Sequence, residues 1–275
     1  MGDGSSSRAT ESFQPVPVTS PVNHPLAFRL RCLVDLQLAT IVQYLRPALA
    51  GLHGRVLDVG AGQSPWRAWL PQGTQYQGID VGHAADFGMA AQGNDVIYYA
   101  GKAMPLPDTA FDAVLCIEVL EHAESPQLLL AEISRVMLDG GTLLLTVPWS
   151  ARRHHVPHDY HRFTRERLHS LLEEAGFDGI DIRERGNDIG AIANKLIVLT
   201  ARLLRPRQPW HALATWPAAV VCGVLACGFI AAAHISVAWG LGSKDDPLGY
   251  FVRASKAGSG EAAPADQRDS ANKFS

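Results

Sequence analysis

Apolar runs of about strand length alternate with helical patterns along most of this chain. That order is typical of an open α/β sheet, in which each strand is followed by a helix that packs on the sheet. The first five strands are predicted at residues 55–59, 76–80, 96–99, 113–117 and 142–147. A sixth strand carries the alternating Ile180 and Ile182, and residues 248–254 predict a seventh.

Three helical patterns fit between or before these strands. Apolar residues from Leu30 to Leu45 recur at helical spacing and predict one leading helix that stops near Pro47. A second helix is predicted over 126–138, with the glycines of "DGG" at 139–141 as its stop. Thr164 is expected to cap a third helix that ends at Gly176. The resulting fold class is a Rossmann-like seven-stranded sheet with helices on both faces.

The stretch from 208 to 243 contains no Asp, Glu, Lys or Arg, and residues 217–239 alone are long enough to span about 30 Å as a helix. Arg202, Arg205 and Arg207 precede it, and the positive-inside rule would keep the preceding domain cytoplasmic. If residues 248–254 return to the sheet, both ends of the insertion lie on one side. A hairpin in the membrane interface, a spanning helix, and a soluble cap or dimer face therefore remain as alternatives.

These boundaries divide the chain into five parts. We expect a disordered start at 1–22, a main domain at 23–186, the apolar helical insertion at 187–246, a last strand at 247–256 and a disordered tail at 257–275. The net charge of −3 and the lack of a long basic block argue against nucleic acid as a partner. Four cysteines without a CxxC pair favour reduced thiols and a cytoplasmic location.

The sequence "VLDVGAGQSP" at 56–65 places a glycine turn at the end of the first strand, the edge where open α/β sheets bind ligands. Asp58 would repel a pyrophosphate but can accept hydrogen bonds from an ammonium group. Asp80, at the tip of the second strand, is placed to bind both hydroxyls of a ribose. A ligand with a ribose and an ammonium group but no phosphate is S-adenosylmethionine.

Four segments in the same order strengthen this interpretation: "VLDVGAG", "YQGIDV", "MPLPDTAFDAVLCIEVLEHA" and "GGTLLLTVP". Over roughly residues 25–185 the chain resembles a class I S-adenosylmethionine-dependent methyltransferase with a type 11-like domain. The resemblance implies that Asp58 holds the amino acid end of the cofactor and that Asp80 and Val81 lie at its ribose. It further implies that these residues line or approach the cofactor: Gly60, Ala61, Gly62, Gly101, Lys102, Cys116 and Glu118.

The chain departs from the family pattern at two points. Ser64 and Pro65 stand at and after the third glycine position, and the acidic residue often found near the adenine is missing from "YAGKA". A nicotinamide-dependent oxidoreductase is the less favoured enzyme alternative, because Asp58 and the absent GxGxxG do not suit a pyrophosphate. A non-catalytic, membrane-associated protein that binds the cofactor is the alternative from another class.

Methyl transfer to a neutral hydroxyl requires a base. Five of the eleven histidines fall between 154 and 169, after the fifth strand. His158, beside Asp159 and Tyr160, is the preferred base, and Tyr160 is included with it as a catalytic residue; the alternative is that these are solvated loop residues. The stretch "PHDYHRFT" resembles one found in a branch of the family often predicted to act in glycan or lipid pathways.

Glu118, Glu121 and His122 have the spacing of one helical face and could together hold a divalent ion. Acidic residues in the first turn of a helix explain the same pattern without an ion, and no metal is predicted. We therefore expect methyl transfer from S-adenosylmethionine to a small-molecule, lipid-linked or glycan acceptor, most readily at oxygen. The expected location is cytoplasmic, with association to the inner face of a membrane through 208–243.

Overall fold

A computed structural model describes residues 16, 18, 20–82, 95–206 and 208–258 of the chain. Seven strands form one sheet in the order β3-β2-β1-β4-β5-β7-β6. All pairs are parallel except those of β7, which runs antiparallel to both β5 and β6. Their bounds are β1 Arg55–Val59, β2 Gln75–Val81, β3 Val96–Tyr99, β4 Phe111–Ile117, β5 Met137–Pro148, β6 Phe177–Arg185 and β7 Gly249–Lys256.

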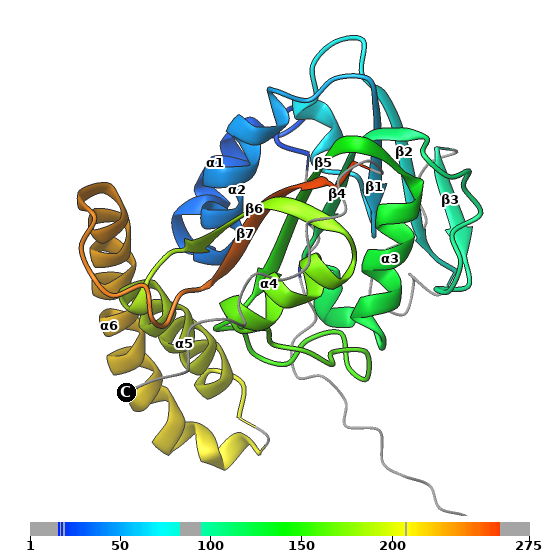
Figure 1. Cartoon of the computed structure of the whole chain (residues 1–275). Coiled ribbons are helices and arrows are strands. Elements are labelled where there is room, and N and C mark those ends of the chain that lie inside the picture. The colour runs from blue at the N-terminus through cyan, green and yellow to red at the C-terminus, as the bar shows by residue number, and fades with distance from the viewer. Residues whose placement is uncertain (1–15, 17, 19, 83–94, 207, 259–275) are drawn as a thin grey trace, which may run out of the picture.

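Helices cover both faces of this sheet, which confirms the predicted fold class (Figure 1). The helices α1 (Pro25–Val34) and α2 (Leu36–Leu49) pack on one face, where Val56 and Leu115 point. The other face is covered by α3 (Pro126–Val136) and α4 (Arg165–Glu174), against residues such as Leu57 and Val114. Adjacent strand residues thus face opposite layers, as the period of two requires.

Two of the predicted helices end elsewhere. The single leading helix is two helices, because the Asp35 side chain accepts a hydrogen bond from the Leu38 amide at 3.1 Å and so caps a new helix. The prediction that "DGG" ends α3 is also wrong, since α3 ends at Val136 and β5 begins at Met137. The segment instead forms an irregularity in the pairing of β4 with β5. A Cβ at Gly141 would lie 2.8 Å from the Leu138 carbonyl oxygen, so only glycine fits there.

Between β6 and β7 the chain forms the helical insertion that the sequence predicts. The helix α5 (Asp188–Leu203) leads away from the sheet, the turn Pro209–His211 reverses the chain, and α6 (Ala212–Trp239) packs beside α5 (Figure 1). Asn187 caps α5 and donates hydrogen bonds at 2.8 Å to the Ser236 hydroxyl and to the Leu241 carbonyl. The returning end of the hairpin is therefore fixed to its start, next to the sheet.

By length and composition, the stretch Pro209–Trp239 is able to cross a membrane, with a mean hydropathy of 2.2 and 17% burial in its most apolar window. The predicted disordered ends, 1–22 and 257–275, and Arg207 fall largely outside the described residues. The division into domains stays a prediction.

Candidate functional site

The glycine turn follows β1 at the carboxyl edge of the sheet. Gly60 and Gly62 have φ angles of +69° and +51°, in the left-handed region that favours glycine. A Cβ on Gly60 would lie 2.4 Å from a methyl carbon of Val119. The amides of Gly60 and Ala61 donate to the Ile79 carbonyl at 2.8 and 3.2 Å. The turn is thus held against β2, with bare backbone toward the space above the sheet.

Asp58 lies buried beneath this turn. The Tyr76 hydroxyl donates to its carboxylate at 2.8 Å and lies 2.7 Å from the Ser64 hydroxyl oxygen. Burial raises the pKa of Asp58 to about 7, with a further increase from the charge of Asp80 and a partial offset from the Tyr76 hydrogen bond. A cationic group bound above the turn would favour the ionised carboxylate.

Asp80 ends β2 beside the same turn. Its carboxylate accepts hydrogen bonds from the Gly62 amide at 2.9 Å and from the Val81 amide at 2.7 Å. One acid therefore ties the second strand to the glycine turn, and the turn and the acid keep a constant relative position.

A cavity of about 600 Å³ opens beside the turn. Its walls come from the glycine turn, the end of β4, the loop after β5, the helices α1 and α2, and α5 of the insertion. The wall residues that offer bare backbone or a titratable side chain to a ligand include Gly60, Gly62, Glu118, His122, His154 and His155. This volume is within the range of about 300–1,000 Å³ that is usual for small-molecule sites.

These features fit the amino acid end of S-adenosylmethionine. Bare backbone at Gly60 and Gly62 admits a close ligand, and the buried Asp58 carboxylate suits an ammonium group. The cofactor supplies an activated methyl group on a sulfonium when it is bound. The chain's own contribution would be to hold that molecule at the edge of the sheet, beside the cavity.

A family model described as a methyltransferase domain matches residues 33–182. The chain belongs to this family. Membership confirms the predicted class, an S-adenosylmethionine-dependent methyltransferase domain, and with it the cofactor of the family and an enzyme domain. The nicotinamide-dependent alternative is accordingly set aside.

Similarity to curated relatives covers only a short part of the chain. An uncharacterized methyltransferase of Mycobacterium avium is 35% identical over 96 residues, which cover 33% of this chain and 38% of the relative; one of Mycolicibacterium paratuberculosis matches over the same extent. The chain thus spans well under half the length of the curated relatives it matches.

Two of the solved structures with a similar backbone fold are methyltransferases. One, from Thermotoga maritima, is described as a possible histamine N-methyltransferase; it is 14% identical, covers 86% of this chain and 96% of its own, and has a TM-score of 0.49. Phosphoethanolamine N-methyltransferase 2 of Haemonchus contortus, in complex with S-adenosylmethionine, is 17% identical, covers 82% and 53%, and has a TM-score of 0.46. Likenesses of this extent say nothing about the acceptor.

Within the methyltransferase domain the predicted cofactor residues fall into two groups. Gly60, Ala61, Gly62 and Glu118 line the cavity, and Asp58 and Asp80 lie directly at the glycine turn. Four other predicted residues are not among the described residues that line the cavity: Val81, Gly101, Lys102 and Cys116. The Cys116 side chain is fully buried in the core, and burial raises the pKa of its thiol, so a contact of this residue with the cofactor would have to come from its backbone. Roles for the other residues stay predictions.

The helical face predicted from Glu118, Glu121 and His122 does not form. Glu118 has a φ angle of +56°, and only Leu120–His122 make a short helical turn. The Glu118 carboxylate instead pairs at 2.7 Å with the fully buried guanidinium of Arg185 on β6. The positive φ turns Glu118 away from the direction that helical spacing would give it.

The predicted base, His158, has other neighbours than the sequence suggests. His158 and Tyr160 are not among the described residues that line the cavity. The Asp159 carboxylate, expected to orient His158, instead accepts from the Arg162 guanidinium at 2.7 and 2.9 Å and lies 3.6 Å from Nδ1 of His154. His158 Nδ1 lies 3.2 Å from the Tyr160 hydroxyl, which donates to Glu124 at 3.0 Å, so these two predicted residues are neighbours, and their catalytic role stays a prediction.

His122, His154 and His155 are the imidazoles that line the cavity. Burial, together with the nearby His154, lowers the pKa of His122 to about 3, so this ring is neutral near pH 7. Its Nδ1 lies 2.6 Å from the His158 carbonyl oxygen. Because a carbonyl only accepts, Nδ1 carries the proton, and Nε2 is unprotonated. Sequence spacing does not predict that His122 lies beside two residues more than thirty positions later.

Two further residues of the site were missed by sequence reasoning. Tyr76 supports Asp58 from within β2, and Arg185 supports Glu118 from β6. Nothing in "IDIRER" separates the buried Arg185 from the exposed Arg183, since both occupy the same side of the alternation. The only available signal for Tyr76 is its place on β2, four residues before Asp80 and on the same side of the alternation.

The role of Asp80 leads to a first prediction. In Asp80→Ala the affinity for S-adenosylmethionine, measured by calorimetry, should fall about tenfold or more, because hydrogen bonds from the ligand and the support of Gly62 are both lost. Asp95→Ala, which removes an exposed acid paired with Arg67, is the matched control and should bind normally. Equal affinities in all three proteins would contradict a ribose-binding role.

Proposed function

We propose that this protein transfers the methyl group of S-adenosylmethionine to a hydroxyl of a lipid-linked acceptor at a membrane surface. The observation that carries the proposal is the position of the cavity between the glycine turn and α5. The partner of α5 in the hairpin is the long apolar helix α6. An acceptor held in a membrane under α6 would reach the cavity from the side of α5.

The helix α6 buries small residues and exposes large apolar ones, which is the reverse of a helix in a water-soluble bundle. The residues it buries are small, with Ala219, Ala226 and Ala233 spaced seven apart. Large apolar side chains face outward, and Val220 and Val224 are 66% and 69% exposed. Small residues at the helix contact and large apolar residues outside are typical of helices that pack in lipid. A soluble protein would rarely leave such an apolar surface uncovered.

The charge of α5 favours a hairpin that lies along the membrane over one that crosses it. Lys195 is 65% exposed and pairs loosely with Asp246 at 3.6 Å, and Arg202 lies in the last turn of α5. Burying these charges in hydrocarbon would be costly. Trp210, Trp216 and Trp239 are exposed near the two ends of the apolar stretch, where indole rings suit the headgroup region.

Oxygen is the proposed methylated atom because of the polar groups in the cavity. A sulfonium methyl needs an acceptor in line with it, so positioning accounts for most of the rate. A hydroxyl must also lose its proton, whereas a free amine need not. Three imidazoles line the cavity beside Glu118, and a nonpolar wall from α2 and α5 would exclude water. These polar groups lie where an acceptor hydroxyl would lose its proton.

The test combines membrane binding with methyl transfer. The purified full chain should bind vesicles of equal parts zwitterionic and anionic phospholipid, and the double variant Val220→Asp, Val224→Asp should bind at least about tenfold more weakly, since a carboxylate in lipid costs on the order of 1 kcal/mol or more. The matched control is Leu128→Asp on α3, which changes a side chain that is 67% exposed far from α6. Equal binding by both variants would contradict the membrane surface.

The activity is measured with methyl-labelled S-adenosylmethionine and fractionated membrane extracts. Label is expected in the lipid fraction, in an ether or ester, and it should fall in the α6 double variant. Label confined to water-soluble products would contradict the acceptor class. Binding of the cofactor without transfer to any fraction would instead support the alternative of a non-catalytic, membrane-associated cofactor-binding protein.

A further inference from the structure

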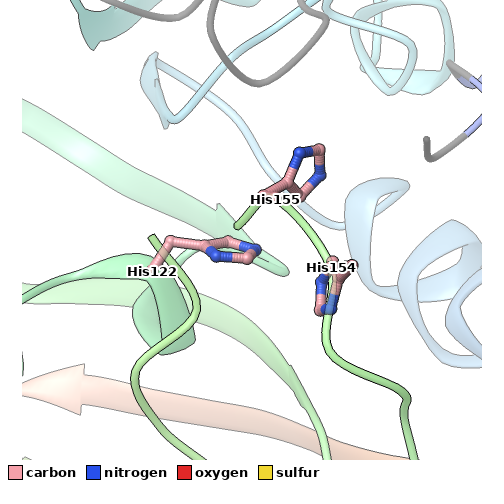
Figure 2. A group of neighbouring side chains, drawn as sticks. All are labelled: His122, His154 and His155. Atoms are coloured by element: carbon pink, nitrogen blue, oxygen red, sulfur yellow. The ribbon is translucent and has the colours of Figure 1, made fainter. Parts of the chain in front are cut away.

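Three histidines from two separate loops meet at one wall of the cavity. His122 follows β4, and it points toward the loop after β5 that carries His154 and His155 (Figure 2). The centroids of the three rings are 4.8, 5.0 and 5.2 Å apart. One nitrogen from each ring lies within 4.8 Å of those of the other two. Three imidazoles therefore surround one small volume.

A buried carboxylate faces the same volume. Glu121 is 0% exposed, and neither of its carboxylate oxygens has a hydrogen-bond partner among the described residues. Its Oε1 lies 3.6 Å from Nε2 of His122 and 4.0 Å from Nε2 of His154. A buried carboxylate without hydrogen bonds is costly unless it is protonated or lies beside a cation, so a bound cation would stabilise its ionised form.

In two of the three rings, the Nδ1 atom has a polar partner in the protein. Nδ1 of His122 donates to the His158 carbonyl at 2.6 Å. Nδ1 of His154 lies 3.1 Å from the Arg152 carbonyl and 3.6 Å from the Asp159 carboxylate. Carbonyl and carboxylate partners of this kind fix the tautomer and direction of histidines that bind metal through the other nitrogen. Both Nε2 atoms are on the side of Glu121.

We propose that His122, His154, His155 and Glu121 bind a divalent transition-metal ion of the zinc type. Three imidazoles and one carboxylate are a ligand set for zinc or iron, whereas magnesium and calcium prefer oxygen alone. Tetrahedral zinc with bonds near 2.0–2.1 Å places its ligand atoms about 3.4 Å apart. The ligand nitrogens of the three rings lie within 4.8 Å of one another, and Glu121 Oε1 lies 3.6 and 4.0 Å from Nε2 of His122 and His154, so side-chain rotations would have to bring the four groups closer around an ion.

An ion at this position would be exposed to the acceptor, because the three histidines line the cavity. An acceptor hydroxyl that replaced Glu121 as the fourth ligand would have its pKa lowered by a zinc-type ion, and the released Glu121 carboxylate could take up its proton. This use of the ion rests on the proposed O-methylation. Binding of the ion does not, and the two can fail separately.

The binding test uses the purified full chain, stripped with a chelator and titrated with zinc in a calorimeter. A single tight site is expected, and cobalt bound in its place should give the visible spectrum of a four-coordinate ion. His154→Ala should weaken zinc binding by at least about a hundredfold, since even the loss of an outer partner costs about ten- to a hundredfold. His169→Ala, which removes an exposed histidine paired with Glu173, is the matched control and should leave the affinity unchanged.

Glu121→Gln separates a ligand from a merely structural residue. Glutamine keeps the volume and removes the buried charge, so the stripped protein should be as stable as the wild type or more stable, while its zinc affinity should fall at least about tenfold. A changed stability with unchanged zinc affinity would overturn the role of Glu121. The whole proposal is overturned if the wild type binds no zinc, or if His169→Ala weakens binding as much as His154→Ala. Zinc binding without methyl transfer would count against the proposed function alone.

Discussion

Replacing Arg185 by methionine is expected to lower the free energy of unfolding by about 3–5 kcal/mol, the usual cost of removing one partner of a buried ion pair. The Arg185 guanidinium is fully buried and pairs with Glu118 at 2.7 Å. It also donates to the carbonyls of Tyr250 and Val147, both at 3.2 Å, and to that of Gln37 at 3.3 Å. Methionine has a similar reach but no donor, so the carboxylate would lose its charged partner and the carbonyls would lose one donor.

Chemical denaturation with fluorescence detection measures this change. Arg183→Met is the matched control: Arg183 lies two residues earlier on β6, and its pair with Asp181 is exposed, so the midpoint should barely move. Adding Glu118→Gln to Arg185→Met should recover part of the loss, since it removes the charge that arginine no longer neutralises. An Arg185→Met protein as stable as the wild type would mean that the buried pair contributes nothing.

A carboxylate with a raised pKa gives the second large effect. The pKa of Asp58 rises from 3.8 to about 7 on folding, so its contribution to stability is complete below about pH 4 and is lost as pH rises through 7. Asp58→Asn removes that titration and keeps an oxygen for the Tyr76 hydroxyl. At pH 8 the variant should therefore be more stable than the wild type, by up to about 4 kcal/mol at 1.4 kcal/mol per pKa unit.

The difference between the two proteins should shrink as the pH falls from 8 toward 4, measured by denaturation of the cofactor-free protein across that range. Asp95→Asn, which alters an exposed acid, is the control and should show no comparable gain. A constant difference between Asp58→Asn and wild type at every pH would contradict the raised pKa. The same variant should bind S-adenosylmethionine more weakly, because the ammonium group would lose its charged partner.

The site was predicted best where a local rule governs it. Gly60 and Gly62 occupy left-handed backbone, a property visible in the residue type itself. Asp58 and Asp80 lie near the carboxyl ends of two adjacent parallel strands, and such ends meet at one edge of the sheet. The expected orientation of His158 by Asp159 relied on sequence neighbours, and in the 151–164 loop Asp159 pairs with His154 and Arg162 instead, while the role of His158 as a base stays a prediction.

The sequence by itself determined the alternation of strands and helices, the glycine turn with its two acids, and a hairpin helix without charge. Each of these follows from periodicity, residue conformation or composition over a short window. Only the tertiary structure decided which side chains meet across loops. His122 joins His154 and His155 because β4 and β5 are paired and their following loops lie side by side.

Burial of polar groups was likewise a tertiary property. Arg183 and Arg185 are equivalent in the strand pattern, yet only Arg185 lies under Gly249, where an added Cβ would be 2.4 Å from its guanidinium. The row of small residues on α6 has a structural role only because α5 packs against it. Such contacts join residues that are distant in sequence, and their energies depend on the exclusion of water by the whole fold, which no local pattern encodes.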